Sequence, residues 1–274
     1  MVDILDYFEK RKEELKEEVT KLYRKPKLVV VQIGDDKASS IYVKNKEKLC
    51  DEIGLDFEHE HIEEEKNNEE NYTLLKILEK SMDSSVDGVI LQLPIPNESN
   101  LDILQKAIYL DKDVDGFRNG SDFTPCTPKG IMDWLDYNEY KLEGKNVVVI
   151  GRSKIVGRPL VNLLIDRGAT VTCCNSKTKD LRQHTCNADI VISAVGKAKF
   201  LDSSYFTNTE LVIDVGINRD ENGKLCGDID YQEVTSNLEN IYVTRVPNGV
   251  GKLTVLSLIE NTIEAYKRKT VLAH

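Results

Sequence analysis

The sequence predicts an α/β protein built on parallel sheets, and three observations lead to this prediction. Short apolar runs alternate with amphipathic stretches along the 274 residues. The runs at 27–34 and 145–150 are apolar almost throughout, as is typical of strands buried on both faces of a parallel sheet. Glycine or proline follows many of these runs, so strands and helices succeed each other as they do in βαβ units.

The first half opens with an amphipathic helix over residues 3–23, where apolar side chains recur at helical spacing among Lys and Glu. The strand at 27–34 follows. A helix then begins, for which Ser39 or Ser40 can supply the cap, and it ends before Gly54. The other expected elements of this half are a strand at 55–62, a helix at 74–82, a strand at 86–94 and a helix at 101–108.

A loop at 111–128 contains Gly116, Gly120, Pro125 and Pro128, and we expect a domain junction there. The second half then continues the same alternation. Its expected elements are a helix at 129–138, strands at 145–150, 169–174, 189–195, 211–215 and 241–244, and a last helix at 254–268. We therefore expect two α/β domains, one formed by 1–118 with 251–274 packing back onto it and one formed by 119–250.

Overall composition excludes several kinds of partner. The chain carries 37 Lys and Arg against 47 Asp and Glu, a net charge of −10, so it lacks the basic surface that nucleic-acid binding requires. No apolar run approaches the roughly 20 residues that span a bilayer, and the N-terminus shows no basic-then-apolar secretory pattern. The six cysteines form no CxxC pair and the four histidines no ligand pattern. These features predict reduced thiols, a cytoplasmic protein, and no nucleic-acid, membrane or metal partner.

A glycine-rich turn lies between the strand at 145–150 and the helix that follows it. Gly151 can make the tight turn and Gly157 permits close packing, although Ser153 stands at the middle glycine position of the usual GxGxxG pattern. Such a turn lets a helix N-terminus cradle a pyrophosphate, and residues 145–182 are basic within an acidic chain. We expect a Rossmann-like NAD(P)-binding sheet here, with an ordinary strand–helix turn as the alternative.

Two residues favour NADP over NAD. The strand at 169–174 and the residues just after it carry no acid that could bind the ribose hydroxyls of NAD. Arg152 and Ser176 are instead suited to a 2′-phosphate, with the guanidinium as a fork and the hydroxyl as a donor. The alternative is that Arg152 is a solvated loop residue.

The first half contains a candidate lysine site. Tyr42 and Lys46 share one face of a predicted helix, and a desolvated lysine can act as acid or base near neutral pH. Gln92 and Asp115 are both expected at the carboxyl ends of strands, where open α/β sheets bind ligands. A carboxylate there can accept two hydrogen bonds from an amino-pyrimidine-like edge. The alternatives are a common helix-surface pair, a wet edge strand at Gln92 and an Asx turn at Asp115.

Together these motifs resemble the bifunctional methylenetetrahydrofolate dehydrogenase/methenyltetrahydrofolate cyclohydrolase family. The resembling segments, in the family's order, are 42–46, 88–96, 112–117, 125–130, 151–157, 169–172, 214–218, 227–230 and 246–251. The resemblance implies two α/β domains with a folate cleft between them and, usually, a homodimer. It implies that residues 1–118 with 251–274 bind folate and that 119–250 bind NADP.

The resemblance also assigns roles to residues of this sequence. It implies that Lys46 is the catalytic lysine, that Gln92 orients it, that Asp115 grips the pterin edge and that Tyr42 positions the folate. The implied substrate-binding residues are Tyr42, Gln92, Asp115, Pro247 and Gly249. The implied cofactor-binding residues are Gly151, Arg152, Ser153, Ser176 and Ile217.

The function implied is the NADP-dependent oxidation of 5,10-methylenetetrahydrofolate and the hydrolysis of the methenyl product to 10-formyltetrahydrofolate. Arg245, Asn248, Lys252 and Leu253 depart from the run that the family usually carries after its last strand. Asn248 tolerates a left-handed backbone, so we expect the turn there to survive. Two alternatives stay open: a two-domain NADP oxidoreductase of another small substrate, like the shikimate dehydrogenases, and a non-catalytic nucleotide- or folate-binding relative.

Overall fold

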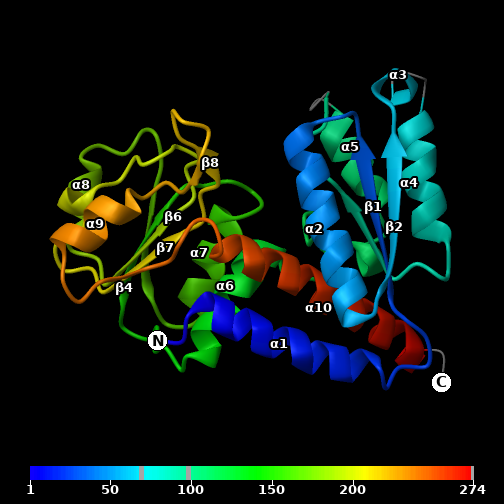
Figure 1. Cartoon of the computed structure of the whole chain (residues 1–274), viewed down its shortest axis with the longest axis horizontal. Helices are drawn as coiled ribbons and strands as arrows, with labels where there is room; N and C mark the ends of the chain where they lie inside the picture. Colours follow the sequence, from blue (N-terminus) through cyan, green and yellow to red (C-terminus); the bar gives the residue numbers. More distant parts are fainter. Residues whose placement is uncertain (68–70, 97–99, 273–274) are drawn as a thin grey trace. The chain divides into compact units, whose positions relative to one another are not determined.

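The computed structural model describes residues 1–67, 71–96 and 100–272, in which helices and strands alternate (Figure 1). The first elements are α1 (Ile4–Val19), β1 (Lys27–Ile33), α2 (Lys37–Ile53), β2 (Asp56–Ile62), α3 (Glu64–Asn67), α4 (Tyr72–Met82), β3 (Gly88–Leu91), α5 (Leu101–Ala107) and the 3₁₀ turn η2 (Leu110–Lys112). The later elements are α6 (Cys126–Tyr137), β4 (Asn146–Ile150), α7 (Gly157–Asp166), β5 (Thr170–Cys174), α8 (Leu181–Thr185), β6 (Ile190–Ser193), the 3₁₀ turn η3 (Ser203–Tyr205), β7 (Leu211–Asp214), β8 (Asn218–Arg219), β9 (Leu225–Cys226), α9 (Tyr231–Asn237), β10 (Tyr242–Val243) and α10 (Val250–Leu272).

The chain forms two compact units, each made of two stretches of sequence. The small-sheet unit consists of Glu9–Cys126 and Val255–His274, and the large-sheet unit consists of Met1–Phe8 and Thr127–Thr254. The expected divisions at 118/119 and 250/251 thus differ from the observed ones by eight and four residues, and the expectation did not separate the first eight residues from the rest.

Contacts of the first residues explain their place in the large-sheet unit. The Trp134 Nε1 donates a hydrogen bond of 3.0 Å to the Val2 carbonyl. The Tyr7 ring lies 4.9 Å from the Tyr137 ring between centroids. Both partners belong to α6, so the start of the chain packs on a helix more than a hundred residues away, which no local sequence pattern indicates.

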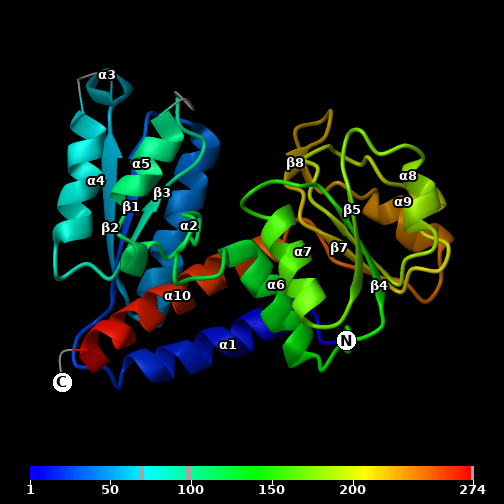
Figure 2. The ribbon, with the colours of Figure 1, turned by 180° about the vertical axis from the view of Figure 1, so that it is seen from behind.

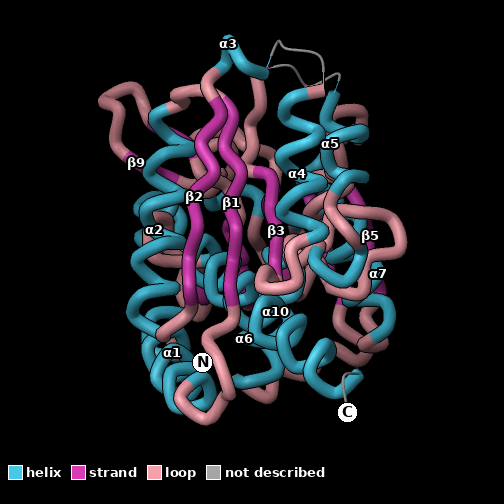
Figure 3. The backbone as a smooth tube through the Cα atoms, turned by 90° about the vertical axis from the view of Figure 1, so that its right-hand side faces the viewer, coloured by secondary structure: helices cyan, strands magenta, loops and turns pink. Residues whose placement is uncertain are grey.

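The small-sheet unit has the strand order β2-β1-β3, and both pairings are parallel. Val29 and Val31 of β1 point into a core shared with α4 and α5, and each such side chain contributes roughly 1.5–3 kcal/mol when buried. On the opposite face, the Gln32 Nε2 donates a 3.1 Å hydrogen bond to the Ser40 hydroxyl of α2. Figure 3 shows α2 on one side of the strands and α4 with α5 on the other. The sheet is therefore covered on both faces, as its apolar strands predict.

The large-sheet unit has the order β10-β7-β6-β4-β5, again entirely parallel, and β8 with β9 forms a small antiparallel hairpin. Figure 2 shows α7 on one side of these strands and α8 with α9 on the other. The chain runs from β4 outward to β5 and then returns to β6 on the other side of β4. Such a reversal creates a crevice at the carboxyl ends of β4 and β6, where doubly wound sheets bind ligands. The prediction of two α/β domains with parallel sheets is confirmed.

The ends of α2 correct one expectation and confirm another. Its cap is Asp36, whose carboxylate accepts a 2.7 Å hydrogen bond from the Ser39 amide, and not Ser39 or Ser40. The negative charge of an aspartate at this position also interacts favourably with the positive, N-terminal end of the helix dipole. Gly54 ends the helix with a φ of 101°, as predicted.

The last helix is longer than expected: α10 begins at Val250 and continues to Leu272, whereas the sequence predicted a helix over 254–268. The short elements α8, α9, β8 and β9 were not expected, since segments of two to seven residues carry too few apolar positions to show a period. Among the described residues, no helix combines the length and apolar character that crossing a bilayer requires.

Candidate active site

The side-chain amide of Gln92 holds Lys46, the candidate lysine of the first half of the chain. Lys46 lies on α2 one turn after Tyr42, so the two side chains share a face of the helix. The Lys46 Nζ donates a hydrogen bond of 2.7 Å to the Gln92 Oε1. The Gln92 Nε2 donates to the Leu93 carbonyl at 2.7 Å, which orients the amide so that its oxygen faces the lysine. Gln92 directly follows β3 and is buried, so the sheet fixes its backbone.

Burial changes the proton affinities of Lys46 and Asp115 in opposite directions. It lowers the pKa of Lys46, against the influence of the Asp115 charge. It raises the pKa of Asp115 to about 6, although the Lys46 charge and a hydrogen bond with the Cys126 thiol both act to lower it. The structure thus brings Lys46, Gln92 and Asp115 into one site in the small-sheet unit. A partly desolvated amine and a carboxyl group that titrates near pH 6 are suited to moving protons.

Two buried residues hold the Asp115 loop, and the sequence analysis singled out neither. Asn261 of α10 donates through Nδ2 to the Val114 carbonyl at 2.8 Å and to the Thr124 carbonyl at 3.3 Å. The Cys126 Sγ donates to the same Val114 carbonyl at 3.3 Å. Cys126 has a buried free thiol, and its hydrogen bond with Asp115 acts to lower the pKa of that carboxyl group.

The glycine-rich turn of the large-sheet unit is tightly closed. A Cβ on Gly151, whose φ is 122°, would lie 2.5 Å from the Ala194 carbonyl oxygen. A Cβ on Gly157 would lie 2.2 Å from the Gly151 oxygen, so neither position admits a side chain. The Ser153 hydroxyl accepts hydrogen bonds from the Val156 and Gly157 amides at 3.1 and 3.3 Å. Ser153 therefore satisfies the first amides of α7, and the turn keeps the close backbone approach that a pyrophosphate needs.

Sheet register brings Arg152 and Ser176 to the same edge. Ile150 of β4 pairs with Cys174 of β5, and the Gly151 amide donates to the Cys174 carbonyl at 2.9 Å. Arg152 lies two residues after Ile150, and Ser176 lies two residues after Cys174. Both side chains are exposed. A guanidinium and a hydroxyl therefore stand beside the carboxyl end of the crevice. Ile217, the other predicted cofactor residue, follows β7 in the same unit and is 46% exposed.

The 245–252 loop contains the two other predicted substrate residues, Pro247 and Gly249. A Cβ on Gly249 would lie 2.1 Å from the Arg245 carbonyl oxygen, so this turn requires glycine. Asn248 has a φ of 72°, which confirms the expected left-handed backbone. The Lys252 Nζ lies 4.8 Å from the centroid of the Phe8 ring, a cation–π distance. These residues belong to the large-sheet unit, whereas Lys46 belongs to the small-sheet unit.

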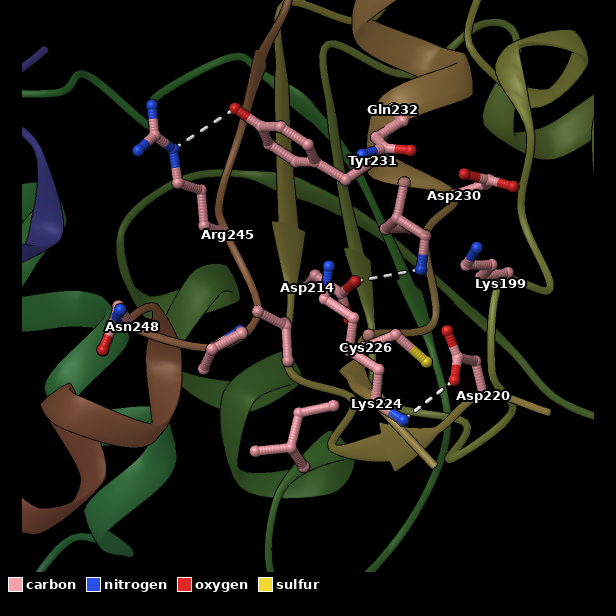
Figure 4. A pocket seen from close by; sticks show the side chains of 15 residues that line it. Lys199, Asp214, Asp220, Lys224, Cys226, Asp230, Tyr231, Gln232, Arg245 and Asn248 are labelled. Atoms are coloured by element: carbon pink, nitrogen blue, oxygen red, sulfur yellow. Dashed lines mark hydrogen bonds between the residues drawn. The ribbon is translucent and has the colours of Figure 1, made fainter. Parts of the chain in front are cut away.

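A pocket of about 280 Å³ lies within the large-sheet unit, beside β8, β9 and the start of α9 (Figure 4). Lys199, Lys224 and Arg245 line it together with three aspartates, so its charges balance. The Arg245 Nε donates a 3.3 Å hydrogen bond to the Tyr231 hydroxyl at one side. Pro247 also lines this pocket.

The histidines of β2 lie apart from these sites. The His59 Nε2 is 3.1 Å from the Gln32 Oε1, and the His61 Nε2 is 3.1 Å from the Gly34 carbonyl. Both imidazole rings therefore have hydrogen-bond partners within the small-sheet unit. In the part of the chain that the structure describes, no group of three His, Cys, Asp or Glu side chains could hold a metal ion.

Comparisons with known proteins agree with this arrangement. The model of the tetrahydrofolate dehydrogenase/cyclohydrolase catalytic domain matches residues 3–115, and the model of the NAD(P)-binding domain of the same family matches residues 125–270. The chain is 46% identical over 270 residues to the bifunctional protein FolD of Agathobacter rectalis, an alignment that covers 94% of this chain and 95% of that protein.

Solved structures show the same fold. The bifunctional enzyme FolD, methylenetetrahydrofolate dehydrogenase/cyclohydrolase, of Campylobacter jejuni superposes with a TM-score of 0.92 at 41% identity, over 97% of this chain and 98% of that one. The N5,N10-methylenetetrahydrofolate dehydrogenase-cyclohydrolase of Trypanosoma brucei, solved with NADP and an inhibitor, gives a TM-score of 0.90 at 28% identity, over 98% of each chain. The chain therefore belongs to the tetrahydrofolate dehydrogenase/cyclohydrolase family.

Proposed function

We propose that this protein oxidises 5,10-methylenetetrahydrofolate with NADP and hydrolyses the resulting methenyl compound to 10-formyltetrahydrofolate. The observation that carries this proposal is the hydrogen bond between Lys46 and Gln92 in the site that also holds Asp115. It gives the unit matched by the catalytic-domain model an amine of lowered pKa, oriented beside a carboxylate. A non-catalytic relative would have no need to keep all three groups together.

The glycine-rich turn fits a dinucleotide. The tight approaches at Gly151 and Gly157 leave no side chain between the turn and a ligand, so a pyrophosphate could bind close to the backbone at the start of α7. Arg152 and Ser176 would hold the 2′-phosphate of NADP, and Ile217 would contact the cofactor from the loop after β7. When bound, NADP supplies an acceptor for the hydride that leaves the methylene carbon. The task of the protein in that step is to hold the substrate in a reactive orientation.

The hydrolytic step requires proton transfer, which we assign to Lys46. Water adds to the carbon of the methenyl cation and gives up a proton, and the neutral Lys46 amine accepts it. The hydroxyl formed on this carbon then loses its proton as the carbonyl forms, the bond between the carbon and N5 of the folate breaks, and N5 gains a proton. One of the two protons of water thus ends on N5, and the other, first accepted by Lys46, is the one that the overall reaction releases. Gln92 would keep the lysine in place, Asp115 would accept hydrogen bonds from the amino-pyrimidine edge, and Tyr42 would position the folate. Pro247 and Gly249 would contact the substrate.

The test is a spectrophotometric assay that supplies methylenetetrahydrofolate with NADP or NAD and follows the methenyl product. We expect the methenyl absorbance to appear faster with NADP and then to decay as the product is hydrolysed. No absorbance change with either nucleotide would refute the proposed oxidation. A faster reaction with NAD would refute the assignment of Arg152 and Ser176 to a 2′-phosphate.

We further propose a homodimer in a reducing, cytoplasmic setting. All six cysteines have free thiols, and Cys173 is exposed on β5, as is ordinary where thiols stay reduced. β5 is one of the two edge strands of the large sheet, and an exposed edge strand is a surface on which a second chain can pair. Sedimentation equilibrium should give twice the chain mass of 31.1 kDa, and a single-chain mass would contradict the dimer.

A further inference from the structure

The loop after β6 borders the crevice of the large-sheet unit. It begins at Ala194, directly after Ser193, and its backbone meets the glycine-rich turn, since a Cβ on Gly151 would lie 2.5 Å from the Ala194 oxygen. The two loops therefore fix each other's position. Any group that holds the loop after β6 also influences the turn assigned to the pyrophosphate.

One buried carboxylate holds this loop. The Asp228 Oδ2 accepts hydrogen bonds from the Ser193 hydroxyl at 2.9 Å and from the Val195 amide at 2.8 Å. Its Oδ1 accepts from the Lys197 amide and from the Asn218 Nδ2, both at 2.9 Å. The side chain is completely buried, so these four donors replace water. Asp228 thus joins the loop after β6 to the loop after β7, which carries Ile217.

A second carboxylate holds the segment that carries Asp228. Asp214, at the end of β7, accepts hydrogen bonds from the Gly216, Asp228 and Ile229 amides at 2.9, 3.0 and 2.9 Å. Figure 4 shows the last of these, beside the pocket that Asp214 lines. Burial raises the pKa of Asp214 to about 7, while its amide partners act to lower it.

Glycines make room for both carboxylates. A Cβ on Gly216 would lie 2.2 Å from the Asp228 Oδ1, and a Cβ on Gly227 would lie 1.8 Å from the Asp214 Oδ2. The two segments therefore interlock closely. The four hydrogen bonds of Asp228 go to the end of β6, to the loop after it and to the start of β8, and not to the helices that cover the sheet, which indicates a role in the crevice.

We propose that Asp228 is a positioning residue for the dinucleotide, which fixes the Val195–Lys197 backbone and Asn218 around the crevice without touching the substrate. This role rests on the proposed use of NADP. Asparagine at this position would replace one acceptor oxygen by an NH₂ group, which would face two donors and push them away. The loop after β6 would shift, and the nucleotide would lose contacts that depend on its position.

The experiment compares Asp228→Asn with Asp220→Asn in the full-length protein. Asp220 undergoes the same chemical change in the hairpin turn, where its Oδ1 accepts from the nearby Asn222 and Lys224 amides. We expect Asp228→Asn to weaken NADP binding about 10- to 100-fold by titration calorimetry and to raise the KM for NADP equally. Its hydrolysis of methenyltetrahydrofolate, measured without nucleotide, should stay within about twofold of wild type. Asp220→Asn should match wild type in both measurements.

Two results would overturn the role of Asp228. One is unchanged NADP affinity in Asp228→Asn, and the other is an equal loss of nucleotide binding and nucleotide-free hydrolysis, which indicates a general structural role. If Asp228→Asn does not fold, Asn218→Ala removes a single donor and leaves the carboxylate. It should weaken NADP about 3- to 10-fold, and unchanged affinity there would also refute the role. A wild-type protein that binds NADP but does not oxidise the folate would refute the proposed function alone, because the binding comparison stands without turnover.

Discussion

Lys46 and Asp115 show how two side chains acquire chemistry from their surroundings. Neither residue is unusual by type, but burial lowers the pKa of the lysine and raises that of the aspartate. Each charge partly offsets the effect of burial on the other. Gln92 adds direction, because its amide has one oxygen and that oxygen faces the lysine. The reactivity of this site therefore depends on its position at the end of β3 and beside the Asp115 loop.

Replacing Lys46 by methionine tests the proton transfer. The variant keeps most of the volume of the side chain but has no amine, so hydrolysis of methenyltetrahydrofolate should fall by about 100- to 10,000-fold. NADP affinity should be unchanged. The matched control is Lys44→Met on the same helix, where the side chain is exposed and full activity is expected. Full hydrolysis by Lys46→Met would rule out a role for this lysine.

The raised pKa of Asp115 predicts that folate binding weakens as the pH falls below 6. Its pKa of about 6 lies above the ordinary value of 3.8, so the folded protein protonates this carboxyl as the pH falls through 6. The protonated acid is a poorer acceptor for the amino-pyrimidine edge, and the KM for the folate should therefore rise roughly tenfold per pH unit below 6. Steady-state kinetics between pH 5 and 8 would measure it. An Asp115→Asn variant should have a KM that is high at every pH, and a variant that keeps the wild-type profile would assign the titration to another group.

Arg152 allows the cofactor preference to be tested separately. Arg152→Ala should weaken NADP by about 10-fold or more and leave NAD nearly unchanged, because only NADP carries the 2′-phosphate. Lys154→Ala is the control, since it removes a charge from the same exposed turn. Equal losses for both nucleotides, seen by calorimetry, would show that Arg152 does not discriminate between them.

At the scale of elements, the turn between β4 and α7 is sharply constrained by its backbone. Gly151 and Gly157 admit no side chain, and Ser153 supplies the acceptor for the first amides of the helix. Arg152 and Ser176 each lie two residues beyond the last paired residues of β4 and β5. The shape of this turn thus follows from a few backbone constraints.

Gly157→Ala should therefore destabilise the protein by about 3 kcal/mol, because its Cβ would meet the Gly151 oxygen at 2.2 Å. Gly144→Ala serves as the comparison. Gly144 has a φ of 76°, but no described atom lies within 4 Å of its Cβ, so only backbone strain of about 1 kcal/mol is expected. Urea unfolding would measure both. Equal losses in the free energy of unfolding would mean that the close approach at Gly157 does not add to the destabilisation.

The sequence predicted the parts of this site that depend on local pattern. Alternating apolar runs placed the strands, the spacing of Gly151 and Gly157 indicated the turn, and the spacing of Tyr42 and Lys46 placed them on one face of α2. Asn261 was not found, because its role depends on carbonyls more than 130 residues away in sequence. Asp228 was missed for the same reason, since its donors include Ser193 at the end of β6 and Asn218 after β7. Local pattern locates elements, whereas contacts distant in sequence complete the sites.

At the scale of the whole molecule, the chain crosses between its units inside helices. The first crossing falls within α1 and the third within α10, while the second follows Cys126 at the start of α6. Each unit is therefore assembled from two distant stretches. The large-sheet unit depends on the first eight residues, which pack on α6 through Trp134 and Tyr137.

Deleting residues 1–8 should lower the melting temperature of the large-sheet unit by about 5–10 °C, because the ring packing of Tyr7 and the acceptor for Trp134 are both lost. Differential scanning calorimetry with and without NADP would identify the transition of this unit, since the ligand stabilises only the unit that binds it. Trp134→Phe loses the hydrogen bond alone and should give a smaller shift. An unchanged transition in the deletion would show that the unit is stable without its first segment.

The interlocked segments around Asp214 and Asp228 have a consequence for how this fold can diverge. Each carboxylate fills the space that a side chain on Gly227 or Gly216 would take, so the four positions are not free to change one at a time. A larger residue at position 227 becomes acceptable only after position 214 has become smaller, and the same holds for positions 216 and 228. Recombination between distant members of the family that exchanges β7 without the segment after β9 would join mismatched halves. The two segments are separate in sequence, but a change in one of them is tolerated only together with a matching change in the other.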